Sequence, residues 1–197
     1  EEEERIKNED RVRQSYAIRS YCYRRKGYKD KEQFNKAIEC IEKVEAKDKE
    51  AKKDTPDINM MLEKAFIYME MDEFDKCLDL TRILIEDYQV YAAYATEQEA
   101  YSKMWDAEGV LKSGYNCIYF YPDYMRPYER IAKVYFDLKY TEDLKKLLAD
   151  AKEQNFKSVY LDSYEYKLTH DVPDNDVLDK KLEEFRKEYL EKVEEGR

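Results

Sequence analysis

Three basic residues lie close together in the stretch MRPYERIAK. Arg126, Arg130 and Lys133 are separated by four and three residues, so an α-helix would place all three side chains on one face. A guanidinium group can hold a carboxylate through two parallel hydrogen bonds, which makes this face suited to an acidic or carboxylate-bearing segment of a partner protein. The alternative is neutralisation within the chain, with Glu129 or Asp123 shielding the two arginines.

Residues that support catalysis are few. His170 is the only histidine and lies in a turn-like stretch, and the segment GVLKSG lacks the spacing of a phosphate-binding loop. The four cysteines are widely separated and form no CxxC pair, so a zinc site is not expected; they are Cys22, Cys40, Cys77 and Cys117. We therefore expect no enzyme activity, no metal and no cofactor, and reduced, mostly buried thiols in a cytoplasmic protein.

The composition favours an all-α domain. The 197 residues include only four Gly and four Pro, fewer than a fold rich in tight turns requires. Aromatic residues make up 14% of the chain, which argues against disorder. A net charge of −10 makes nucleic acid and anionic membranes unexpected partners, although a local basic patch is compatible with it. No apolar stretch approaches the roughly 20 residues of a membrane span, and the start EEEER without Met suggests a fragment of a longer protein.

Four sets of residues repeat with the same two spacings, 33 and 34 positions. The sets are Tyr68, Tyr101 and Tyr135; Cys77, Val110 and Leu144; Leu84, Cys117 and Ala151; and Met61, Tyr94 and Tyr128. A shared period of this length indicates repeated helix pairs. It assigns the stretch CIYFYPDY to the end of a helix that closes before Pro122, rather than to a strand. The second set is then expected to be buried between the two helices of each pair.

This period and these residue classes resemble the tetratricopeptide repeat, a helix-turn-helix of about 34 residues. The resemblance implies an all-α, right-handed helical solenoid of about four helix pairs, closed by a C-terminal capping helix. Three repeats would run over residues 58–90, 91–124 and 125–158, and Pro122 falls on the proline position of the family.

The rest of the chain completes this organisation. Residues 1–13 would form a charged N-terminal extension, 14–46 a degenerate first repeat, 47–57 a charged linker, 58–158 the three repeats, and 159–197 a short helix followed by the capping helix. Two registers stay open for the first helix of the degenerate repeat, one set by Tyr28 and one, longer by about two turns, set by Ala17. Thr55 and Pro56 predict the N-cap and first turn after the linker. The capping helix is predicted from an apolar stripe of Leu178, Leu182, Phe185, Tyr189 and Val193.

The resemblance also implies a binding groove lined by the first helix of each repeat, with Arg126, Arg130 and Lys133 facing it. Modules similar to the heat-shock-organising co-chaperone grip the carboxylate ends of chaperone tails with five residues. Arg126 and Arg130 occupy two of those positions, and the other three hold Leu62, Phe66 and Thr96. Thr96 joins the candidate site on this ground.

Taken as a whole, the pattern predicts a non-catalytic scaffold or adaptor that binds a partner protein or peptide within a larger assembly. Two alternatives remain open: a co-chaperone module that binds acidic C-terminal chaperone tails, and a structural spacer in a longer solenoid. Trp105 lies in a turn between paired helices, where packing between repeats is expected and an exposed partner anchor is the alternative.

Overall fold

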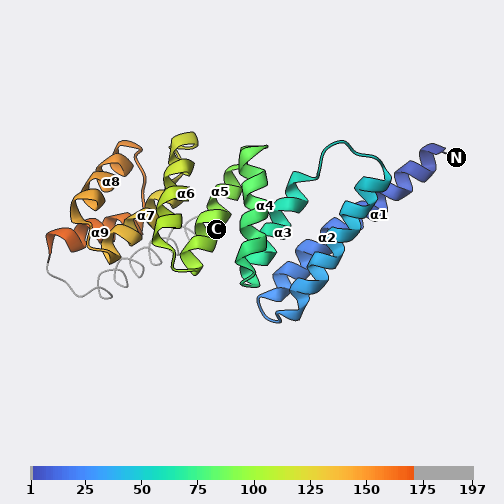
Figure 1. The fold of residues 1–197 in the computed structure, drawn as a ribbon, viewed down its shortest axis with the longest axis horizontal. Helices are drawn as coiled ribbons and strands as arrows, with labels where there is room; N and C mark the ends of the chain where they lie inside the picture. The colour runs from blue at the N-terminus through green and yellow to red at the C-terminus, as the bar shows by residue number, and fades with distance from the viewer. Residues whose placement is uncertain (1, 171–197) are drawn as a thin grey trace, which may run out of the picture. The chain divides into compact units, whose positions relative to one another are not determined.

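The computed structural model describes residues 2–170, with side chains from residue 7 onward, and this part of the chain is all-α, with nine helices and no strand (Figure 1). The helices are α1 (Glu2–Gly27), α2 (Glu32–Glu50), α3 (Ile58–Glu70), α4 (Phe74–Glu86), α5 (Tyr91–Lys103), α6 (Ala107–Phe120), α7 (Met125–Asp137), α8 (Thr141–Glu153) and α9 (Val159–Thr169). The all-α prediction is confirmed over this range. The predicted capping stripe that starts at Leu178 lies outside the described residues.

The predicted period is visible in the helix boundaries. The helices α3, α5 and α7 begin at Ile58, Tyr91 and Met125, each the first residue of a predicted repeat. Their partners α4, α6 and α8 begin with the same two spacings. The stretch CIYF forms the last turn of α6, which ends at Phe120 with Tyr121 as the C-cap before Pro122. The helical assignment is therefore confirmed, and no strand is present there.

The turns repeat as well as the helices. The turn inside each of the three predicted repeats contains one residue in the left-handed region: Asp72 with φ 62°, Trp105 with φ 59° and Lys139 with φ 60°. These positions favour glycine, because a Cβ atom crowds the following carbonyl in that conformation. A common turn geometry thus joins three helix pairs of nearly equal length, which is consistent with a helical repeat.

The chain divides into two compact units, Glu1–Met104 and Trp105–Arg197. The division falls between α5 and α6, inside the predicted repeat 91–124. Cys77, Val110 and Leu144 are all buried. Cys77 packs in a cluster with Ala65 and Met69 of its partner helix α3, and Leu144 does the same with residues of α7.

In the first unit, α1 and α2 form a long pair against which α3 packs. The core between them is made of Phe34, Ala37, Ile41, Val44, Met60 and Ile67. The helix α1 is continuous from the predicted N-terminal extension through the predicted first repeat, and α2 runs to Glu50 into the predicted linker. The longer of the two first-helix registers therefore describes the actual helix length better.

The start of α3 differs from the sequence-based expectation. Asp57, not Thr55, is the N-cap, and its carboxylate accepts hydrogen bonds from the backbone N–H groups of Asn59 and Met60. The same carboxylate accepts a hydrogen bond from Arg13 of α1 at 2.5 Å. Thr55 and Asp57 both have cap-forming side chains, and Asp57, the one in contact with Arg13, caps the helix.

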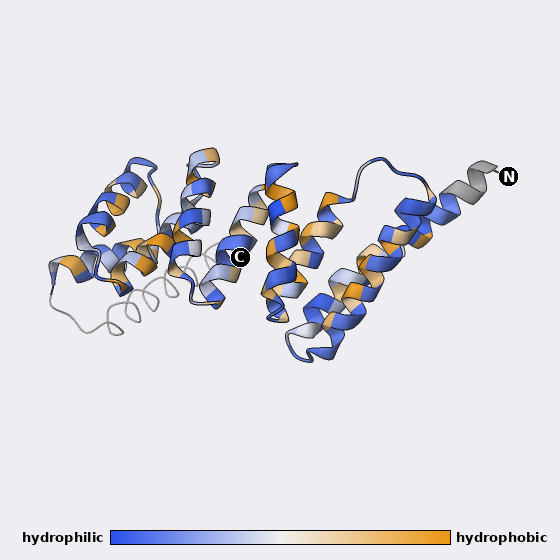
Figure 2. Cartoon of the chain, viewed as in Figure 1, coloured by the Kyte–Doolittle hydropathy of each residue, from blue (hydrophilic) through white to orange (hydrophobic). Residues whose placement is uncertain are grey.

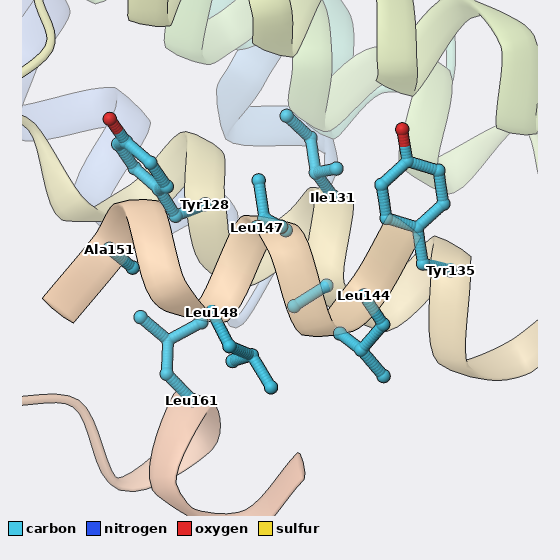
Figure 3. Packing of buried hydrophobic residues seen from close by; sticks show 9 residues of the cluster. Tyr128, Ile131, Tyr135, Leu144, Leu147, Leu148, Ala151 and Leu161 are labelled. Carbon is cyan, nitrogen blue, oxygen red and sulfur yellow. The ribbon is translucent and has the colours of Figure 1, made fainter. Parts of the chain in front are cut away.

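In the second unit, α7 and α8 enclose a core that α9 covers (Figure 3). Its buried residues are Tyr128, Ile131, Ala132, Tyr135, Leu144, Leu147, Leu148, Ala151 and Leu161. Leu161 of α9 points toward Leu148 of α8 (Figure 3). A hydrogen bond of 2.8 Å between the hydroxyl groups of Tyr115 and Tyr135 ties α6 to α7. This packing orients the opposite face of α7 away from the core.

Candidate functional site

The basic residues of α7 are positioned by its apolar face. Burial of Tyr128, Ile131 and Tyr135 against α8 leaves the side chains of Arg126 and Lys133 on the outside of the helix. Arg126 is 67% exposed and Lys133 is 54% exposed. The structure thus brings these two cations to one exposed face, as their spacing predicts.

Both exposed cations have an acidic neighbour on the same helix. Arg126 lies 3.5 Å from the carboxylate of Glu129, and Lys133 lies 2.6 Å from that of Asp137. Glu129 is buried, and its carboxylate also accepts a 2.6 Å hydrogen bond from the hydroxyl of Ser158, the residue that caps α9. The neutralisation considered for the two arginines is therefore seen for Arg126, through Glu129, and Lys133 has an acidic neighbour of its own in Asp137.

Arg130 occupies a different environment from its two neighbours. It is half-buried, while they are exposed. Burial raises the pKa of the Cys117 thiol on α6 to about 11, and the positive charge of Arg130 opposes that rise. The positive charge of Arg130 therefore acts on the α6 thiol as well as contributing to the face of α7.

A hollow of about 410 Å³ opens at the C-terminal end of the α7 face. It is lined by Tyr135, Phe136, Asp137, Lys139, Thr141, Leu144 and Leu168. The ammonium group of Lys167 on α9 lies 4.9 Å from the centre of the Phe136 ring and 5.8 Å from that of Tyr164. Sequence reasoning missed both the hollow and Lys167, because α9 lies outside the three aligned repeats and the hollow needs residues from three helices.

The fourth predicted site residue, Thr96, belongs to a different compact unit from α7. It is buried on α5, in the first unit, and its hydroxyl donates a 2.8 Å hydrogen bond to the backbone carbonyl of Ala92. Phe66, at another of the five positions, lies under the guanidinium group of Arg24 at 4.9 Å. Within the second unit, the candidate face on α7 and α9 consists of Arg126, Arg130, Lys133 and Lys167 with the adjoining hollow.

Trp105 is the most exposed large apolar side chain among the described residues, at 87%. The expectation that it packs between repeats is wrong. Its backbone lies in the left-handed region, which is unusual for a bulky residue. The exposed side chain keeps the alternative of a partner contact open.

Residues 2–170 contain no cluster of three or more His, Cys, Asp or Glu side chains arranged to hold a metal ion. Over the same residues, no helix combines the length and the apolar character that crossing a membrane requires.

Comparison of the chain with models of known protein families and with curated proteins found no match.

Proposed function

We propose that this chain is a non-catalytic, tetratricopeptide-like module that binds a partner protein, as a scaffold or adaptor, through the face of α7 and α9. The partner segment on this face is acidic or ends in a carboxylate. The observation that carries the proposal is the exposure of Arg126 and Lys133 on one helix face, beside a hollow with an apolar lining.

The acidic neighbours on α7 leave room for such a partner. The guanidinium of Arg126 has five N–H donors and a single 3.5 Å contact with Glu129, so donors remain for a second carboxylate. Lys133 and Asp137 are both more than half exposed, and surface pairs of this kind contribute only about 0–1 kcal/mol. A partner carboxylate can therefore compete with Asp137 for Lys133.

The hollow adds a second requirement on the partner. Aromatic and aliphatic side chains from Phe136, Leu144 and Leu168 line it. Lys133 contacts Asp137 and Lys167 lies over Phe136, and both of these contacted residues line the hollow. A segment with carboxylates for the cations and one apolar side chain for the hollow fits both features. Buried anchors of this type carry much of the energy of protein interfaces.

The test is the double charge reversal Arg126→Glu with Arg130→Glu. The matched control is Lys145→Glu with Lys146→Glu on α8, which changes the net charge by the same amount on an exposed surface. Both variants are first checked for unchanged helicity by circular dichroism, and their partners are then compared in quantitative pull-downs from lysate of the source cells. We expect the α7 variant alone to lose partners. Retention of every partner by the α7 variant at physiological salt would contradict the proposal.

A further inference from the structure

The most one-sided charge distribution in the chain lies on α1 and the turn after it. Residues 11–29 hold seven Arg or Lys residues and no Asp or Glu, which leaves 29 basic residues against all 46 acidic ones in the rest of the chain. Six aromatic or aliphatic residues larger than alanine that interrupt this segment are partly or well exposed; they are Val12, Tyr16, Ile18, Tyr21, Tyr23 and Tyr28. A positive surface of this size is unusual in a chain with a net charge of −10.

Two of the seven cations serve the fold. Arg13 donates to Asp48 of α2 at 2.5 and 2.7 Å and to Asp57 at 2.5 Å. Arg24 donates to the buried carboxylate of Glu63 on α3 at 2.6 Å. These two arginines face inward and hold α1 against the rest of the first unit.

The other five cations are exposed, and none of them forms an ion pair with a carboxylate among the described side chains. They are Arg11, Arg19, Arg25, Lys26 and Lys29, which we call the α1 basic stripe. The four on α1 fall within an arc of about 120°, and the helix spans about 22 Å between the first and the last of them. Blue, the hydrophilic colour, predominates along α1 (Figure 2). Unlike Arg126 and Lys133 of α7, the cations Arg11, Arg19 and Arg25 have no Asp or Glu three or four residues further along the chain.

Tyrosine rings hold part of this stripe in place. The guanidinium of Arg19 and the ammonium of Lys43 on α2 both lie over the ring of Tyr16, at 5.7 and 5.4 Å from its centre. The ammonium of Lys26 lies 5.8 Å from the centre of the Tyr23 ring, one heptad further along α1. Contacts of this type restrict the cation side chains before binding, so less conformational entropy is lost when a partner binds. They also occupy ring faces that a nucleic-acid base would need for stacking.

One aliphatic side chain stands in the middle of the stripe. Ile18 is 63% exposed and precedes Arg19 on the same side of α1. A single isoleucine buries too little apolar surface to insert the helix into a membrane, whereas one apolar contact flanked by ion pairs is typical of a helix that packs along another helix.

From these observations we infer that the α1 basic stripe is a docking surface for an acidic α-helix of another protein. The helix carries carboxylates at about seven-residue intervals, opposite Arg11, Arg19 and Lys26, and an apolar residue opposite Ile18. Charge complementarity selects it, since the stripe is the one strongly positive segment of an acidic chain. The inference concerns the first unit and does not rest on the function proposed for α7.

The probe is a fluorescently labelled helical peptide with Glu at seven-residue intervals and Leu at its centre, titrated with the full chain at physiological salt and followed by anisotropy. A scrambled peptide of the same composition, single-stranded poly-uridine RNA and vesicles containing phosphatidylserine are titrated in parallel. We expect the ordered peptide to bind most tightly, and its affinity to fall as salt rises. We expect Arg19→Glu with Lys26→Glu to lower that affinity by about tenfold or more, because two attractive contacts become repulsive.

Three further variants decide the interpretation. The α8 variant Lys145→Glu with Lys146→Glu changes the net charge as much as the stripe variant does, and it is expected to bind the peptide as the wild type does. The α7 variant Arg126→Glu with Arg130→Glu is expected to do the same. Ile18→Ser removes an exposed side chain, so it is expected to leave the thermal melt unchanged and to weaken the ordered peptide severalfold. The inference is overturned if RNA or vesicles bind more tightly than the peptide. It is also overturned if the ordered and scrambled peptides bind alike, or if the α8 variant weakens binding as much as the stripe variant does.

Discussion

Gly27, the last residue of α1, lies directly against the aromatic ring of Phe34 on α2. A Cβ atom built at residue 27 would overlap the Cδ1, Cε1 and Cζ atoms of that ring. Phe34 is buried, and its ring also packs edge-on against Tyr28, with the ring centres 5.9 Å apart. The glycine is therefore required by close approach of two helices, since its φ lies outside the left-handed region.

Gly27→Ala is expected to destabilise the first unit by about 1–3 kcal/mol, because a rigid buried ring must move to admit the methyl group. Urea unfolding followed by circular dichroism measures the change. Adding Phe34→Leu to Gly27→Ala provides the control: the smaller side chain is expected to recover part of the loss, so the two changes should couple. Purely additive effects would show that the ring is not the obstacle.

The contact between Arg13 and Asp48 makes the free energy of unfolding depend on pH in the acidic range. Hydrogen bonds from Arg13 and Lys53 hold the pKa of Asp48 below its ordinary value of 3.8, although burial acts in the opposite direction. Because the folded pKa is depressed, this stabilisation is present above pH 3.8 and is lost as the pH falls through the folded pKa.

Asp48→Asn is therefore expected to lower stability by about 1.5–3 kcal/mol at pH 7, the range for hydrogen bonds to charged groups. The difference between variant and wild type should shrink below about pH 4. Denaturant unfolding between pH 2.5 and 7 measures it. A difference that stays constant over this range would rule out the charge on Asp48 as its source.

Lys139 carries a left-handed backbone in the turn between α7 and α8. Lys139→Gly is expected to raise stability by up to about 1 kcal/mol, since glycine adopts this conformation without the Cβ crowding. Thermal unfolding checks the direction of the change. Lys146→Gly in the middle of α8 is the matched control and is expected to cost about 1 kcal/mol. Destabilisation by both changes would mean that the conformation at residue 139 is not strained.

The four cysteines should differ sharply in reactivity. Burial raises the pKa of Cys77 to about 12 and that of Cys117 to about 11, and it also raises the pKa of Cys40, whereas Cys22 is exposed on α1. Since the thiolate is the reactive form, a disulfide reagent at pH 8 is expected to modify one thiol rapidly in the folded chain and all four in denaturant. Cys22→Ser should abolish the rapid phase. Rapid reaction of a second thiol would contradict the described burial.

Much of the fold follows from local features of the sequence. Helix starts at Ile58, Tyr91 and Met125 were predictable because hydrophobic period and turn length are properties of short segments. The cap of α3 was not, since Thr55 and Asp57 are both good caps and the contact with Arg13 spans 44 residues of sequence. The exposure of Trp105 could not be predicted either, because the sequence does not say what neighbours a turn will have.

The candidate site shows the same division. Spacing alone places Arg126 and Lys133 on one face of α7, because an α-helix has a fixed period. Their electrostatic state depends on contacts distant in sequence, such as the one between Glu129 and Ser158, 29 residues further along. The hollow requires side chains from α7, α8 and α9 to meet, which no single segment specifies.

For α1, the sequence by itself determined the sign of the charge, because seven cations without a carboxylate between residues 11 and 29 make any conformation of that segment positive. Only the tertiary structure decided which cations remain available. Arg13 and Arg24 are used internally because Asp48 and Glu63 reach them from helices 35 and 39 residues away. The remaining cations stay exposed because α1 packs on α2 and α3 through its opposite side, and a helix cannot bury both sides in a single layer of contacts.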